Sequence, residues 1–245
     1  MREGGIRADP SRDGLVRLRI ERPPVNVLSG ADLEALAAAV EAHPAARVLL
    51  LTGLPRAFSA GVDVPEHVPE PASIDRMLAA MRRALSALLE TPAVTMAAVS
   101  GACLGGGAEI AAACDVVFAA EDAKIGFPEI RLSCFPPGGC ALLPARIGPS
   151  RAADWILSGD TFSGRDAVEA GFASRWFPTA ELEYEAERFA AALLSRGPAA
   201  LRAATGLLRE GRRRALAAGL SRAEDAYRAL AGDPDLARAV REFSS

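Results

Sequence analysis

The sequence is poor in the residues that metal sites and disulfide frameworks require. Its 245 residues include two histidines, His43 and His67, and four cysteines. No two cysteines have the Cys-X-X-Cys spacing of a zinc or redox motif, and too few histidines are present to complete a zinc site. We therefore expect no metal, and reduced thiols in a cytoplasmic protein.

The chain also lacks the charge and hydropathy patterns of nucleic-acid-binding and membrane proteins. Its formal net charge is −3 and its isoelectric point is about 5.6, which gives no general attraction to polyanions. Lys124 is the only lysine. The N-terminal residues have no apolar core typical of a signal peptide, and no window of about eighteen uninterrupted apolar residues exists, so no membrane span is expected.

Two common catalytic motifs are missing as well. The glycines at 105–107 are not followed by Gly-Lys-Ser/Thr and do not have the Gly-X-Gly-X-X-Gly spacing, which argues against a phosphate-binding loop. No Gly-X-Ser-X-Gly sequence is present, so a serine hydrolase is not expected.

The most informative segment that is present covers residues 97–109. An apolar run ends at Gly101, and three consecutive glycines then lead into Glu109 and an alanine-rich helical run. Glycine allows tight bends and close approach of a ligand to the backbone. The first turn of the following helix has amide groups without intrahelical partners and the positive end of the helix dipole. We expect this turn to bind a negatively charged oxygen, with Glu109 placed for acid–base chemistry.

A second glycine turn, residues 57–63, follows the predicted strand that ends at Thr52. Loops at the carboxyl ends of parallel strands share one edge of the sheet, where ligands bind. Both turns are therefore expected to face one pocket, and one amide from each could bind a single developing oxyanion.

Glu129 is the second carboxylate of interest, 20 residues after Glu109. A helix followed by a strand can return the chain to the same pocket over that distance, and two carboxylates at one centre can take and give a proton. The simpler alternatives are that Glu109 caps a helix and that Glu129 is an exposed loop acid.

The remaining pattern predicts strands that alternate with helices, followed by helices alone. The alternation is typical of a parallel α/β core, against which, or against a neighbouring subunit, the C-terminal helices would pack. Strands are predicted at 16–20, 47–52, 93–99 and 115–119. Helices are predicted at 31–42 with Ser29 as cap, from Ser73 as cap to before Pro92, and at 151–157, 164–170, 181–194, 198–216 and 221–231.

Taken together, these motifs resemble the enoyl-CoA hydratase/isomerase (crotonase) superfamily. The resemblance rests on segments in family order over residues 14–180: 22–28, 57–63, 99–109, 114–115, 127–130, 159–160 and 167–171. It implies an α/β fold, a spiral of ββα units with the active site in residues 1–185. It also implies a C-terminal helical region, residues 186–245, that is used for trimer assembly.

The resemblance further implies an acyl-CoA thioester substrate and a homotrimer or hexamer. The two oxyanion-hole amides of the family fall on Val62 and Gly106, and the two catalytic glutamates of its hydratases fall on Glu109 and Glu129. Coenzyme A enters as part of the substrate, and no other cofactor is implied. The residues expected to contact substrate or CoA are Val25, Arg56, Ala60, Gly61, Asp63, Val64 and Gly105.

The expected chemistry is addition of water to an enoyl-CoA. Two amides on the thioester oxygen stabilise an enolate, which makes Cβ electrophilic; loss of one such donor typically costs roughly 10²–10³ in rate. The hypothesis is that Glu109 takes a proton from the attacking water and Glu129 delivers a proton to Cα.

Departures from the family pattern leave alternatives open. Where many hydratases have a lysine, residues 64–66 read Val-Pro-Glu, and Arg56 could supply the CoA phosphate contact. The segment 135–144, with its Pro-Pro and Leu-Pro, resembles hydratases that act on cyclic dienoyl-CoA. The alternatives are a Δ3,Δ2-enoyl-CoA isomerase, in which one glutamate shuttles a proton, and a non-catalytic acyl-CoA- or RNA-binding homologue. The arginine run 212–214 is more simply a solvated helix face.

Overall fold

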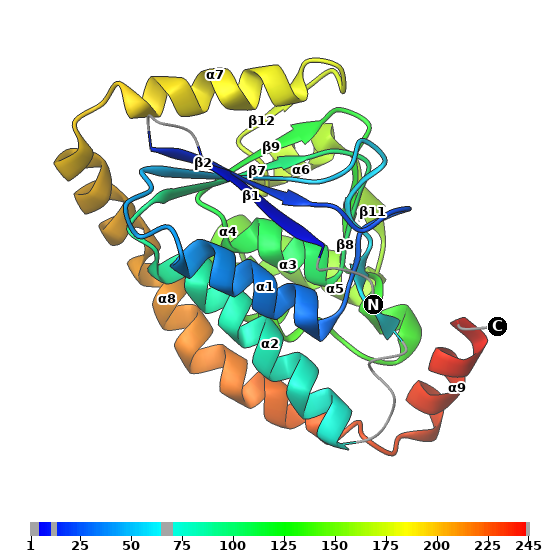
Figure 1. Cartoon of the computed structure of the whole chain (residues 1–245). Helices are drawn as coiled ribbons and strands as arrows, with labels where there is room; N and C mark the ends of the chain where they lie inside the picture. The colour runs from blue at the N-terminus through cyan, green and yellow to red at the C-terminus, as the bar shows by residue number, and fades with distance from the viewer. Residues whose placement is uncertain (1–4, 11–13, 65–70, 244–245) are drawn as a thin grey trace.

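The chain is built around a six-stranded sheet (Figure 1). The structure is a computed structural model that describes residues 5–10, 14–64 and 71–243. The strand order is β1-β2-β4-β7-β9-β12, and every neighbouring pair is parallel except β1 with β2. The bounds are β1 Ile6–Pro10, β2 Leu15–Ile20, β4 Val48–Thr52, β7 Val94–Val99, β9 Val116–Ala120 and β12 Arg175–Phe177.

A second, smaller sheet contains the short strands that follow the central strands of the first sheet along the chain. Its order is β11-β10-β8-β5, and a separate parallel pair joins β3 to β6. Thus β4 leads to β5, β7 to β8 and β9 to β10. The next α-helices along the chain are α2 (after β6), α3 and α4 (after η2), which confirms the expected ββα spiral. The bounds are β3 Val27–Leu28, β5 Ala57–Ser59, β6 Gly61–Val62, β8 Ala102–Leu104, β10 Lys124–Gly126 and β11 Thr161–Phe162.

Helices cover both sides of the large sheet (Figure 1). Helix α7 lies along the upper side in that view, while α1, α2 and α8 lie below it. The bounds are α1 Gly30–Glu41, α2 Pro71–Glu90, α3 Gly106–Ala113, the 3-10 turn η2 Pro128–Leu132, α4 Pro137–Ile147, α5 Pro149–Ser158, α6 Gly164–Ala170, α7 Leu182–Leu194, α8 Pro198–Arg228 and α9 Pro234–Phe243.

Local sequence explains most of these elements. All residues of β4 and β7 are buried, as expected for parallel strands covered on both faces. The alternation in β2 turns Arg17 toward α7, where its Nε donates to Glu187 over 2.7 Å. Ser29 caps α1 as predicted, in a capping box with Asp32.

Two predictions about helices are wrong. Helix α2 begins at Pro71, so Ser73 lies inside it and is not its cap. The helices predicted at 198–216 and 221–231 are one continuous helix, α8. A Cβ atom on Gly219 would lie 3.3 Å from the Ala141 side chain, so this glycine allows α8 to pack closely on α4 and does not end a helix. Helix α9 was not predicted.

The long helix α8 is fastened to the core by a buried ionic cluster. Arg209 is fully buried and donates from Nε to Asp115 over 2.8 Å and from Nη2 to the carbonyl of Ala93 over 2.7 Å. Arg212 donates to the same carboxylate over 2.6 Å. Burial alone would raise the pKa of Asp115, but the hydrogen bonds from Arg209 hold it below its ordinary value.

The cysteines, the hydrophobic segments and one of the histidines were also the subject of sequence-based expectations. All four cysteines are free thiols. Within residues 5–10, 14–64 and 71–243, no helix combines the length and apolar character needed to span a bilayer. His67, with Pro65 and Glu66, lies outside the described residues.

Candidate active site

The two glycine turns meet at the N-terminus of α3. A Cβ atom on Gly106 would lie 3.6 Å from the backbone nitrogen of Val62, and one on Gly61 would lie 3.8 Å from the backbone nitrogen of Gly106. The predicted convergence of the two turns is therefore observed. A Cβ atom on Gly106 would also lie 2.5 Å from Cγ2 of Val62, so a side chain there would displace that of Val62. Two backbone N–H groups from separate ββα units thus lie at one place.

A buried asparagine holds the first of these turns. Asn26 adopts a left-handed φ of 56°, and its side-chain amide donates to the carbonyls of Ile20, Ala57 and Phe58 over 2.8–3.1 Å. The Ser59 hydroxyl donates to the Asn26 carbonyl and accepts from the amide of Gly61. These bonds fix the backbone immediately before Val62.

Glu109 lies in the first turn of α3 and is buried. Its Oε1 accepts a hydrogen bond from the amide of Gly139 over 2.8 Å, at the start of α4. A Cβ atom on Gly138 would lie 3.0 Å from the same oxygen and 2.6 Å from Leu85. Burial raises the pKa of Glu109 to about 7, against the opposing effect of the α4 amides.

Glu129 lies in η2, close to the glycine turn that precedes α3. A Cβ atom on Gly105 would lie 2.8 Å from its Oε1, and its buried Oε2 accepts no hydrogen bond from the described residues. Burial, with the negative charge of Glu109 as a second cause, raises the pKa of Glu129 to about 8. Both carboxyl groups therefore hold a proton more readily than an ordinary glutamate does.

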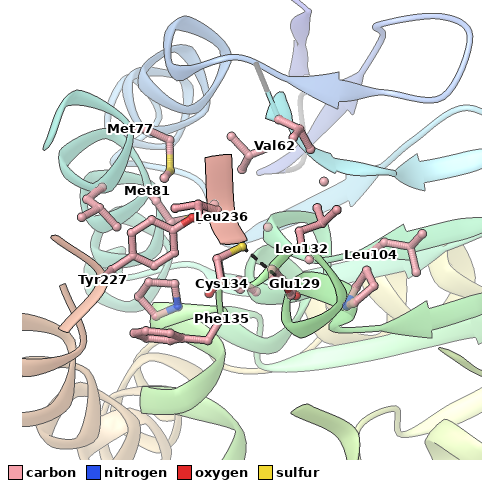
Figure 2. A pocket seen from close by; sticks show the side chains of 18 of the residues that line it. Val62, Met77, Met81, Leu104, Glu129, Leu132, Cys134, Phe135, Tyr227 and Leu236 are labelled. Carbon is pink, nitrogen blue, oxygen red and sulfur yellow. Dashed lines mark hydrogen bonds between the residues drawn. The ribbon is translucent and has the colours of Figure 1, made fainter. Parts of the chain in front are cut away.

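Both glutamates line one cavity of about 250 Å³, in which Figure 2 labels Glu129. Of the other residues predicted for the site, the cavity is also lined by Ala60, Gly61, Val62, Val64, Gly105 and Gly106.

Three predicted contact residues do not line this cavity. Val25 accepts the amide hydrogen bond of Ala60 at its carbonyl, and Asp63 donates from its amide to the carbonyl of Leu28. The side chain of Arg56 is exposed, while its carbonyl accepts from the amide of Ala102. Val25 and Asp63 therefore fasten the turn through the backbone, and Arg56 lies on the surface.

Sequence reasoning missed the apolar wall of the cavity. It is formed by three helices, α2, α8 and α9, and by the segment after η2, as Figure 2 shows for its labelled side chains. The rings of Phe135 and Tyr227 meet edge to face with centroids 5.4 Å apart, and Cys134 donates to the Glu129 carbonyl over 3.4 Å. Further wall residues are Met77, Leu78, Met81, Leu132, Leu220, Leu236 and Val240.

The family of this chain follows from comparison with known proteins. The family model described as enoyl-CoA hydratase/isomerase matches residues 11–243. The chain is 38% identical over 196 residues to the cyclohexa-1,5-dienecarbonyl-CoA hydratase of Thauera aromatica, covering 73% of this chain and 75% of that protein. It is 35% identical to the 2,3-dehydroadipyl-CoA hydratase of Escherichia coli, covering 92% and 90%. The chain therefore belongs to the enoyl-CoA hydratase/isomerase family.

A solved structure supports the same assignment at the level of the fold. An enoyl-CoA hydratase from Mycobacterium avium subsp. paratuberculosis superimposes with a TM-score of 0.89 at 28% identity, covering 98% of this chain and 96% of that chain. The crotonase fold predicted from the motifs is thus confirmed.

Proposed function

We propose that this protein is an enoyl-CoA hydratase and that its substrate is a cyclic dienoyl-CoA. The observation that carries the proposal is the meeting, in one apolar cavity, of two buried carboxyl groups and two glycine-turn amides. Water adds poorly to an alkene, so catalysis has to place negative charge on a thioester oxygen and supply both a base and an acid.

In the proposed reaction the amides of Val62 and Gly106 donate to the thioester oxygen as it becomes an enolate. The positive end of the α3 dipole favours the same charge. No metal or redox cofactor takes part in this route, because the backbone stabilises the enolate and the net change is the addition of one water.

The raised pKa values of the two glutamates fit the two remaining roles, those of base and acid. Ionised Glu109 takes a proton from water as its oxygen bonds to Cβ, and protonated Glu129 delivers a proton to Cα. After the reaction Glu109 holds the proton and Glu129 is ionised, so one proton transfer within the pair restores the starting state. The raised pKa of each carboxyl group keeps both forms available near neutral pH.

A ring is the acyl group that this cavity suits best. An apolar cavity of about 150 Å³ in another protein binds benzene, so a volume of about 250 Å³ accommodates a six-membered ring beside the thioester. Met77, Met81 and Phe135 provide adaptable and aromatic surfaces for it. The relative named for a cyclic dienoyl-CoA supports the same substrate.

We also propose that the protein works in the cytoplasm as a homotrimer or hexamer.

The test is a turnover screen with crotonyl-CoA, a long-chain 2-enoyl-CoA, a 3-enoyl-CoA and cyclohexa-1,5-dienecarbonyl-CoA. We expect loss of the ultraviolet absorbance of the conjugated thioester and a product heavier by one water, with the highest kcat/KM on the cyclic substrate. Conversion of a 3-enoyl-CoA without uptake of water would instead make the protein an isomerase. Tight binding without turnover of any of these substrates would make it a non-catalytic homologue.

A further inference from the structure

One charged side chain in the cavity wall has no part in the proposed reaction. Helix α8 presents Leu220, Glu224 and Tyr227 to the cavity, at the i, i+4, i+7 spacing of one helix face. Glu224 is 3% exposed, and apart from the catalytic pair it is the only charged residue among the described residues that line the cavity. It lies one helical turn before Tyr227, whose ring Figure 2 shows on the opposite side of the cavity from Leu104.

Glu224 has two arginine counter-ions, Arg82 and, at 3.8 Å from Oε2, Nη2 of Arg228, and neither arginine lines the cavity. Arg82 of α2 donates from Nε to Oε1 of Glu224 over 3.0 Å and from Nη2 to its Oε2. The Arg82 side chain is 43% exposed and does not line the active-site cavity. It borders a separate surface depression with Ser86 and Arg213. Of the two paired groups, the carboxylate is therefore the one that an acyl group meets.

From this arrangement we infer that Glu224 is a specificity-determining residue that excludes acyl groups ending in a carboxylate. The inference rests on the proposed function, because it places the acyl group in this cavity. A neutral ring or alkyl end meets an ion pair without net charge and otherwise apolar walls. A second carboxylate would be buried beside the carboxylate of Glu224 without a partner, and both the like charge and the lost hydration oppose its binding.

The same geometry predicts the effect of removing the Glu224 charge. Arg82 donates to both carboxylate oxygens of Glu224, and a guanidinium can form this bidentate pair with any carboxylate. If Glu224 becomes neutral, Arg82 loses its carboxylate partner, and the wall of the cavity beside Glu224 becomes more positive. Replacement of Glu224 is therefore expected to weaken the exclusion and also to favour acidic acyl groups.

The experiment compares binding of two saturated thioesters by isothermal titration calorimetry. Adipyl-CoA ends in a carboxylate, and 6-methylheptanoyl-CoA ends in a neutral isopropyl group of the same shape. In the parent protein we expect the dissociation constant of adipyl-CoA to be at least ~10-fold higher, which corresponds to about 1.4 kcal/mol. In Glu224→Gln that ratio should fall at least ~10-fold, since one like-charge contact of this size is removed.

Glu210→Gln is the matched control, because Glu210 lies on the exposed side of the same helix and the substitution changes the net charge equally. It should leave the ratio unchanged. A second variant, Arg82→Gln, leaves the Glu224 carboxylate without its main counter-ion and should widen the ratio, so the inference is tested even where one variant folds poorly.

Equal binding of the two thioesters by the parent protein, or the same ratio in Glu224→Gln as in the parent, would overturn the inference. Because saturated thioesters cannot be hydrated, this result is independent of turnover. Discrimination in binding without any hydratase activity would refute the proposed function alone. Hydration of an enoyl-CoA by a protein that binds both thioesters equally would refute the inference alone.

Discussion

Glu129 shows most clearly how burial prepares a residue for chemistry. A carboxyl group with an oxygen that accepts no hydrogen bond from the described residues is stable in the fold mainly when it is protonated. The same burial that costs stability therefore supplies an acid near neutral pH. Glu109 differs because the amide of Gly139 bonds its carboxylate form, which suits it to be the base.

This environment predicts how stability depends on pH. The folded-state pKa of Glu129 is raised to about 8 from an ordinary value of 4.5, so its contribution to stability is complete below about pH 4.5 and is lost as the pH rises through 8. Glu129→Gln imitates the protonated form. We expect it to raise the free energy of unfolding at pH 8.5 by on the order of 1–3 kcal/mol and to change it little at pH 4.5.

Urea unfolding at the two pH values measures this difference. Glu210→Gln, an exposed acid, should give the same small change at both. A Glu129→Gln protein that is no more stable than its parent at pH 8.5 would mean that the Glu129 carboxyl group is ionised without penalty in the fold.

The contact of Gly138 with Glu109 allows a test of how accurately the Glu109 carboxyl group has to be positioned. A methyl group on Gly138 would lie 2.6 Å from Leu85 and 3.0 Å from Oε1 of Glu109, so α4 has to move away from the proposed catalytic base. We expect Gly138→Ala to lower kcat by roughly 10²-fold, as misplacement of a catalytic group by about 1 Å does. Gly206→Ala in α8 is the control, because a methyl group there meets nothing within 4 Å. Unchanged kcat in Gly138→Ala would show that the contact is not needed.

The catalytic candidates could be predicted at the residue scale, whereas Gly138 and Glu224 could not. Glu109 and Glu129 lie beside glycine and proline turns whose local chemistry is visible in the sequence. The need for glycine at 138 arises from Leu85 on α2, and the importance of Glu224 arises from Arg82. Such contacts between distant segments leave no local pattern.

Among the elements, α8 depends most on tertiary contacts. Its composition suggests a break near Gly219, yet packing on α4 keeps it continuous. The strands were easier to predict, because β4 and β7 are mostly apolar segments of the kind that a parallel sheet buries on both faces.

We expect Arg209 to contribute more than any other single side chain of α8 to holding this helix on the core. Removal of Arg209 takes both of its hydrogen bonds away from the buried Asp115 carboxylate, which keeps the one from Arg212, and takes one from the Ala93 carbonyl. We expect Arg209→Ala to lower the free energy of unfolding by about 3–5 kcal/mol, the usual cost of breaking a buried ion pair on one side. Arg214→Ala, at an exposed position of the same helix, should change it by less than about 0.5 kcal/mol. Chemical denaturation measures both, and equal effects would contradict the anchoring role.

At the scale of the whole molecule, exposed apolar residues on α8 point to assembly. Leu207 and Leu208 are 73% and 78% exposed in the single chain. We expect light scattering after size exclusion to give three or six times the chain mass of 25.5 kDa. The double variant Leu207→Glu with Leu208→Glu should reduce that mass, and Arg214→Ala should not. A parent protein that is monomeric at micromolar concentration would refute the expectation.

The sequence also limits what can be predicted for the molecule as a whole. The motifs identified the two glycine turns and both glutamates, because these lie in ββα units with recognisable turns. The acyl cavity could not be predicted, since its walls come from α2, α8 and α9, whose amphipathic patterns say which side is buried but not what it faces.

The most direct test of the central claim is incorporation of ¹⁸O from labelled water during a single turnover. The parent protein should place the label in the hydroxyl group of the product. Glu109→Gln and Glu129→Gln should each bind the saturated thioester within about threefold of the parent but incorporate label roughly 10²–10⁴-fold more slowly. Incorporation at the parent rate by either variant would contradict the account.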